Sequence, residues 1–195
     1  MFVVLSVIFP GHAVFNRVIS QIIGGALAVL LTLSVGVFSA HAKDPELVFL
    51  SKLQGTWVGS GRVLAGPDRG KTFKCSLRGK PSRSGIKISM NGKCSVGRFS
   101  ARMGASIKYS KGVRKYLGRF MGGAKGNGMD IYGDRRGNSL KLRLSRGRTQ
   151  GKMDLLLQRK NFMRVIISVT DRSRGRDIPV IALDLKKRRR SASLD

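Results

Sequence analysis

The sequence predicts an all-β protein: a single antiparallel barrel of about 8–10 short strands, preceded by one short helix. Apolar and polar residues alternate through most of the chain after position 43, as they do in strands that bury one face. Glycine-rich segments such as "GKPSRSG" and "SRGRTQG" interrupt this alternation repeatedly, as turns do. Closing the sheet hides the edges of so many strands, so we favour a barrel, with a β-sandwich as the alternative.

The predicted helix occupies "DPELVFLSKL", at residues 44–53. Asp44 is a good N-cap, Pro45 fits the first helical position, and Glu46 places a negative charge at the positive end of the helix dipole.

Strand-like alternation follows the helix as far as residue 185. The apolar positions change parity between Val96 and Phe99, which predicts a β-bulge near Gly97. After the segment around Trp57, we expect strands at residues 73–77, 86–90, 93–103, 106–110, 114–121, 129–132, 140–144, 152–158, 163–170 and 178–185.

The first 42 residues have the features of an export signal. Residues 22–40 carry no charge and lead into Ala40-His41-Ala42, the small-x-small pattern that signal peptidase accepts. This pattern predicts a signal peptide at 1–42, a mature chain that starts at Lys43, and a periplasmic or secreted location. An uncleaved membrane anchor is the alternative, because the uncharged stretch approaches the ~20 residues that span a bilayer.

The chain is strongly basic, with 38 Lys and Arg against 10 Asp and Glu and a net charge of +28. Such a surface attracts polyanions. A cationic run at the C-terminus predicts a disordered basic tail at 186–195. We expect this tail to bind anionic lipopolysaccharide, phospholipid or an acidic partner and to contact membranes peripherally. The alternative is a tail that only improves solubility. Sparse aromatic residues argue against nucleic acid. The run consists of Lys186, Lys187, Arg188, Arg189 and Arg190.

Cysteine and histidine usage limits the chemistry. Cys75 and Cys94 predict one disulfide in an exported protein. Both histidines, His12 and His41, lie in the leader, so the mature chain lacks the usual general base and the commonest metal ligand. We therefore predict no enzymatic activity, no metal site and no cofactor.

The segment "GTWVGSG", with Gly55, Trp57, Gly59 and Gly61, resembles the glycine-tryptophan signature of the calycin superfamily, and its GxWxGxG spacing is similar to that of nitrobindin-type barrels. This resemblance implies a lipocalin-like barrel at residues 43–185 whose first-strand tryptophan closes one end. It also implies an internal ligand site, for which the candidate residues are Trp57, Phe73, Met90, Tyr116 and Phe120.

Two functions of different class follow. The first is a non-enzymatic carrier that binds a small apolar molecule in the barrel close to the anionic envelope. The second is a filled barrel that only displays positive charge to envelope polyanions or an acidic partner. A weaker alternative is haem binding without histidine, in which the iron ligand would come from a tyrosine or a methionine. These candidates are Tyr109, Tyr116, Tyr132, Met90, Met103 and Met129.

Overall fold

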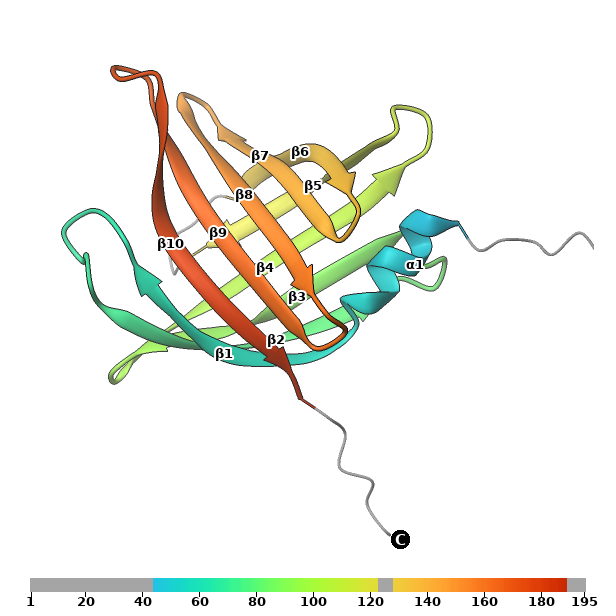
Figure 1. Ribbon diagram of the computed structural model, residues 1–195, viewed down its shortest axis with the longest axis horizontal. Coiled ribbons are helices and arrows are strands. Elements are labelled where there is room, and N and C mark those ends of the chain that lie inside the picture. Colours follow the sequence, from blue (N-terminus) through green and yellow to red (C-terminus); the bar gives the residue numbers. More distant parts are fainter. Residues whose placement is uncertain (1–43, 123–127, 189–195) are drawn as a thin grey trace, which may run out of the picture. The chain divides into compact units, whose positions relative to one another are not determined.

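Ten antiparallel strands close into one barrel, in which each strand pairs with its neighbours along the chain and β10 pairs with β1 (Figure 1). The computed structural model describes residues 44–122 and 128–188. The predicted signal peptide at 1–42, the expected start at Lys43, and Arg189 and Arg190 lie outside the described residues. The predicted all-β barrel with one short helix is confirmed, and the sandwich alternative is wrong.

The elements run in simple up-and-down order around the barrel. They are α1 (Pro45–Lys52), β1 (Gly55–Val63), β2 (Thr72–Pro81), β3 (Lys87–Val96), β4 (Phe99–Ser110), β5 (Lys115–Gly122), β6 (Met129–Arg136), β7 (Ser139–Arg146), β8 (Thr149–Gln158), β9 (Phe162–Asp171) and β10 (Arg176–Lys187). In the described ranges, no helix is long and apolar enough to cross a membrane.

Several sequence predictions about strand limits are wrong, since the three strands expected at 86–90, 93–103 and 106–110 are the two strands β3 and β4. The change of parity at Gly97 is not a bulge, because residues 97–98 form a tight turn that ends β3 and starts β4, with Gly97 at a φ of 55°. The chain reverses there, so the apolar pattern restarts on a new strand. The predicted tail also starts too early, because Lys186 and Lys187 are the last residues of β10 and pair with β1.

Helix α1 covers one end of the barrel (Figure 1). The Asp44 carboxylate caps it by accepting a hydrogen bond from the Glu46 amide at 2.9 Å. Phe49 and Leu50 are buried, as is Leu53 just after the helix. Trp57 is completely buried beside them, and its indole Nε1 donates to the Leu53 carbonyl at 2.9 Å. The tryptophan therefore joins the first strand to the helix that plugs the barrel.

The glycines around Trp57 allow close approach of other groups. A Cβ atom on Gly59 would lie 1.9 Å from the Asp184 carbonyl oxygen of β10, so this residue must be glycine for β1 to pair with β10 as it does. A Cβ on Gly61 would lie 2.3 Å from the Phe73 ring, so the missing side chain makes room for that ring. The cluster thus closes the sheet and admits Phe73.

The predicted disulfide is present. Cys75 on β2 and Cys94 on β3 are directly opposite each other and bonded, across a sequence separation of 19. Closing a loop of this length restricts the unfolded chain and contributes about 3 kcal/mol to stability.

We expect Gly59→Ala to lower the free energy of unfolding by more than about 2 kcal/mol, because the new methyl group would collide with the backbone of β10. Gly112→Ala is the matched control: nothing lies within 4 Å of a Cβ built there. The measurement is urea denaturation followed by circular dichroism. Equal stability of the two variants would show that the close approach of β1 and β10 imposes no constraint.

Candidate ligand-binding site

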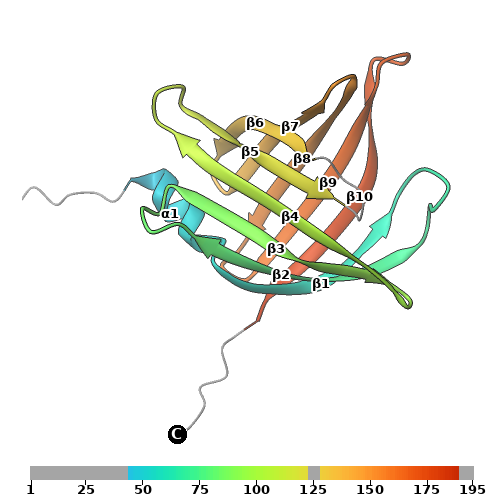
Figure 2. The same cartoon turned by 180° about the vertical axis from the view of Figure 1, so that it is seen from behind.

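A cavity of about 260 Å³ lies inside the barrel, toward the end opposite α1. Val63 at the end of β1, Phe73 near the start of β2 and Val96 at the end of β3 line it, and these strand ends lead into the hairpins far from the helix (Figure 2). Val96 both lines the cavity and is 41% exposed. The cavity therefore opens at this end, which we call the mouth.

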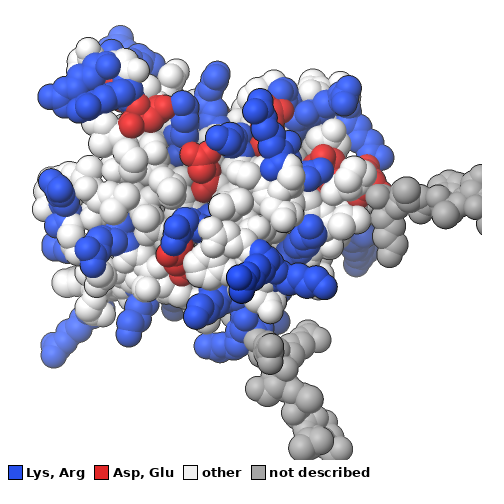
Figure 3. Space-filling model, in the orientation of Figure 1, with Lys and Arg blue, Asp and Glu red and all other residues white. Residues whose placement is uncertain are grey.

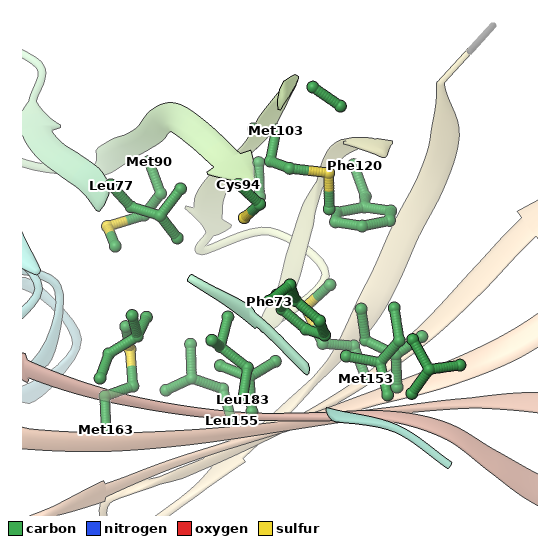
Figure 4. Close-up of a pocket in the computed structure, with 18 of the residues that line it drawn as sticks. Phe73, Leu77, Met90, Cys94, Met103, Phe120, Met153, Leu155, Met163 and Leu183 are labelled. Atoms are coloured by element: carbon green, nitrogen blue, oxygen red, sulfur yellow. The ribbon is translucent and has the colours of Figure 1, made fainter. Parts of the chain in front are cut away.

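The cavity lining is apolar throughout. It includes no hydroxyl, amide or ionisable side chain, and it contains four methionines. Figure 4 shows Met103 beside Phe120 on one side and Met163, Leu155 and Leu183 on the other, with Phe73 between these groups. Methionine is unbranched and polarisable, so such walls adapt to irregular apolar shapes.

Three of the five predicted ligand residues line the cavity: Phe73, Met90 and Phe120. Trp57 and Tyr116 do not; both are buried at the closed end. The prediction placed Trp57 and Tyr116 at the ligand site, whereas these two rings pack with the helix and fill the closed end of the lumen.

Sequence reasoning missed the wall that β8, β9 and β10 contribute. Their inward residues line the cavity, and their alternation with polar residues was already visible in the sequence as strand periodicity. This signal identifies the inward face but does not separate cavity lining from filled core. The missed residues are Met153, Leu155, Met163, Val165, Ile167, Ile181, Leu183 and Leu185.

A polar cluster fixes α1 to the barrel. Arg135 of β6 donates two hydrogen bonds to Glu46, from Nε to Oε2 and from Nη2 to Oε1, each at 2.7 Å. The Tyr116 hydroxyl also donates to Glu46. The bonds from Arg135, followed by that from Tyr116, hold the pKa of the Glu46 carboxyl below its ordinary value. Burial, together with the bond to Glu46, raises the pKa of Tyr116. The cluster is thus ionised on Glu46 and Arg135, and neutral on Tyr116, at neutral pH.

Lys187 serves the closed end as well. Its Nζ lies 5.3 Å from the centre of the Trp57 ring and donates to the Lys52 carbonyl at 3.0 Å. Burial lowers the pKa of this lysine. Lys187 was predicted as part of a polyanion-binding run, but its ammonium group lies against the indole and the end of α1. The preceding residue, Lys186, is exposed to solvent.

The donor set of the cavity does not fit a haem held through histidine, tyrosine or cysteine thiolate. Among the described residues no histidine is present, Tyr109, Tyr116 and Tyr132 do not line the cavity, and Cys94 is oxidised to a disulfide. Met90 and Met103 line it, and Met129 does not. Within residues 44–122 and 128–188, no group of three His, Cys, Asp or Glu side chains is placed to hold a metal ion.

No protein-family model and no curated protein matches the chain. Among solved structures, it is similar to Rv2717c from M. tuberculosis, with a TM-score of 0.59 and 12% identity over 75% of this chain and 99% of that one. It is also similar to the S-type phycobiliprotein lyase CPES from Guillardia theta, with a TM-score of 0.50 and 10% identity over 74% and 92%. Both are lipocalin-like barrels, so the likeness supports a calycin-like fold.

We expect Glu46→Gln to lower the free energy of unfolding by about 2 kcal/mol at pH 7, because the partly buried Arg135 would lose its charged partner. The folded-state pKa of Glu46 is depressed, so its contribution is complete above the unfolded value of about 4.3 and is lost as the pH falls through the lower folded value. Urea denaturation at pH 7 and pH 3 should therefore show a difference between wild type and variant that shrinks in acid.

The control for this variant is Asp184→Asn, which removes an exposed ion pair to Arg164 and should leave stability nearly unchanged at both pH values. If Glu46→Gln lowered the free energy of unfolding by the same amount at pH 7 and at pH 3, the assigned role of the carboxylate charge would be wrong.

Proposed function

We propose that this protein is an exported, non-enzymatic carrier that binds a small apolar molecule in the lumen of its barrel. The observation that carries the proposal is the cavity itself: a filled barrel has no such space, and its walls are wholly apolar. The calycin-like fold supports it, because such barrels enclose ligands. The finer resemblance of the Gly55 to Gly61 segment to nitrobindin-type barrels stays a prediction, and the donor set gives it no haem ligand of the usual kind.

The size and chemistry of the cavity restrict the ligand. An enclosed apolar cavity of about 150 Å³ holds benzene, so about 260 Å³ accommodates roughly ten non-hydrogen atoms. A polar group placed inside would find no partner among these walls and would lose its hydrogen bonds to water. The buried part of the ligand is therefore hydrocarbon, and any polar or charged part lies at the mouth, in contact with solvent.

The second candidate function, display of positive charge to a polyanion, is favoured by the net charge of +28. Its signature is binding that weakens steeply with salt and that needs no ligand in the lumen. The two functions are compatible, because the charge lies on the outward face and the cavity on the inward one.

We expect Ala105→Phe to fill the cavity and weaken the binding of a neutral apolar naphthylamine dye at least about ten-fold, since the ring would occupy the ligand space. The dye is neutral so that surface charge does not attract it. Ala182→Phe is the matched control, because Ala182 alternates with the inward Leu183 and lies on the outer face. Fluorescence titration gives both affinities.

Native mass spectrometry of the protein isolated from its own envelope fraction should show a small-molecule adduct that Ala105→Phe lacks. Repeated preparations without an adduct, together with dye affinities that Ala105→Phe and Ala182→Phe share, would remove the carrier function and leave the display function.

We also expect the isolated protein to begin at Lys43, as cleavage after Ala40-His41-Ala42 requires. Intact-mass measurement of protein from the envelope or medium checks this. Ala42→Leu should block cleavage and leave the full-length mass, because signal peptidase requires a small residue there. A wild-type chain that keeps residues 1–42 would favour the anchor over the cleaved signal.

A further inference from the structure

We propose that the mouth of the barrel docks on an anionic lipid bilayer through the tip of the β3–β4 hairpin, with the outer face of β2, β3 and β4 toward the lipid headgroups. The proposal rests on the carrier function, because it states where the apolar ligand enters and leaves. Three observations carry it: an exposed aromatic residue at the mouth, a strand face without acids, and repulsive pairs of cations on that face.

The exposed aromatic residue is Phe99, which is 84% accessible to solvent. It pairs with Val96 and lies two positions before Ala101, and both of these residues line the cavity. Side chains two apart on a strand share a face, so Phe99 continues the apolar inner surface beyond the mouth. The adjacent Arg98 is exposed as well. A phenyl ring beside a cation on a hairpin tip suits the boundary between headgroups and acyl chains.

The face of β2, β3 and β4 is basic without compensation. No acidic residue occurs between Asp68 and Asp130 in the sequence. Ion pairs to acids of other segments reach only the edges of this region, at Lys71, Lys111, Lys115 and Arg119. We call the outward cations of these three strands the cationic wall, and no ion pair of the described residues includes any of them. They are Lys74, Arg78, Lys80, Lys87, Lys93, Arg102 and Lys108.

Two pairs within the cationic wall are mutually repulsive. Lys87 lies directly opposite Lys108, and Lys93 directly opposite Arg102, on the paired strands β3 and β4. Like charges in directly opposite positions destabilise a sheet. An anionic surface would relieve this repulsion, so the arrangement favours a bound polyanion on this face.

The opposite side of the barrel differs. On β7, Lys141 lies between Asp134 and Asp154, and an outer groove there contains acids among its cations. Figure 3 shows blue side chains without red ones at the lower left, where Figure 1 places the β3–β4 hairpin, whereas red side chains lie among the blue over the strands above it. The charge therefore orients the barrel, and the exposed Phe99 places its mouth at the bilayer.

This orientation identifies the class of ligand. With Phe99 among the lipid headgroups, the apolar mouth faces the acyl chains without an intervening layer of water. The part of a lipid that fits an apolar lumen is its hydrocarbon chain. We infer that the carrier exchanges a short acyl or similar hydrocarbon chain with the membrane, with the anionic head held outside by mouth cations such as Arg98.

The test is flotation of the chain from Lys43 onward, which lacks the apolar segment at residues 22–40, together with vesicles of phosphatidylcholine, with and without phosphatidylglycerol. We expect binding only to the anionic vesicles, and we expect salt to weaken it. Phe99→Ser should weaken it about ten-fold by removing the inserted ring. Val113→Ser is the matched control, because Val113 is 55% exposed on the β4–β5 hairpin at the closed end, and it should bind as wild type does.

A second pair of variants tests the cationic wall. Replacing Lys93 and Arg102 by glutamine should weaken binding about 25-fold, at roughly five-fold for each cation near an anionic surface. The same two replacements at Lys141 and Arg143 on β7 remove equal charge from the other side and should weaken it less than about five-fold. The Lys93 and Arg102 variant should also have a higher melting temperature, since one repulsive pair is gone.

Equal binding by Phe99→Ser and Val113→Ser, or equal losses in the two glutamine variants, would overturn the proposal and leave only diffuse attraction. The dye titration separates this result from a failure of the carrier function. Phe99→Ser should keep the dye affinity, and Ala105→Phe should keep the vesicle affinity. Wild-type protein that binds the anionic vesicles but not the dye would remove the carrier, whereas wild-type protein that binds the dye but not the vesicles would remove the docking surface.

Discussion

The structure depends on how closely β1 approaches β10. These two strands close the barrel, and their pairing brings the Asp184 carbonyl to a place where any side chain on Gly59 would stand. Gly92, Gly118 and Gly133 are in the same situation against neighbouring strands, with a Cβ within 2.1 Å of a backbone oxygen. Small inward residues thus let a ten-strand sheet coil tightly enough to meet itself, and only a closed sheet has an inside in which a ligand can be kept from water.

The barrel has a lumen open at one end because its other end is plugged by tightly connected groups. Trp57 is hydrogen-bonded to Leu53, Glu46 to Arg135 and Tyr116, and Lys187 to the end of α1. Four side chains of the barrel therefore fix the helix and the residue after it. Among residues 44–122 and 128–188, these interior polar contacts lie together at the closed end. The part of the lumen toward the mouth is lined by apolar side chains, which contact a ligand only through dispersion and close packing. The cavity therefore selects for hydrocarbon and not for a particular functional group.

The sequence was informative where one local rule decides the structure. Alternation predicted the strands, Asp44 and Pro45 predicted the helix start, and paired cysteines predicted the disulfide. It misled where distant contacts decide. At Gly97 a change of parity fits either a bulge or a turn, and only the pairing of Val96 with Phe99 distinguishes them. Tyr116 was assigned to the ligand because its attraction to Glu46, 70 positions away, leaves no local trace. Lys187 was assigned to a tail because cation–π contact with Trp57 is equally invisible in a run of five cations.

The distribution of charge argues more strongly for a specific surface than its total does. If the net charge of +28 served only solubility, acids and bases could mix freely, because mixing lowers the electrostatic energy of the folded chain. Instead, the acids of the barrel strands lie on β6 to β10, and β3 and β4 carry cations directly opposite cations. The folded chain tolerates this repulsion on the two strands whose connecting hairpin carries the exposed Phe99 at the open end of the lumen. A neutral apolar partner would cover only the ring, and a small soluble anion would relieve only the charge repulsion. An extended anionic surface with an apolar interior relieves both.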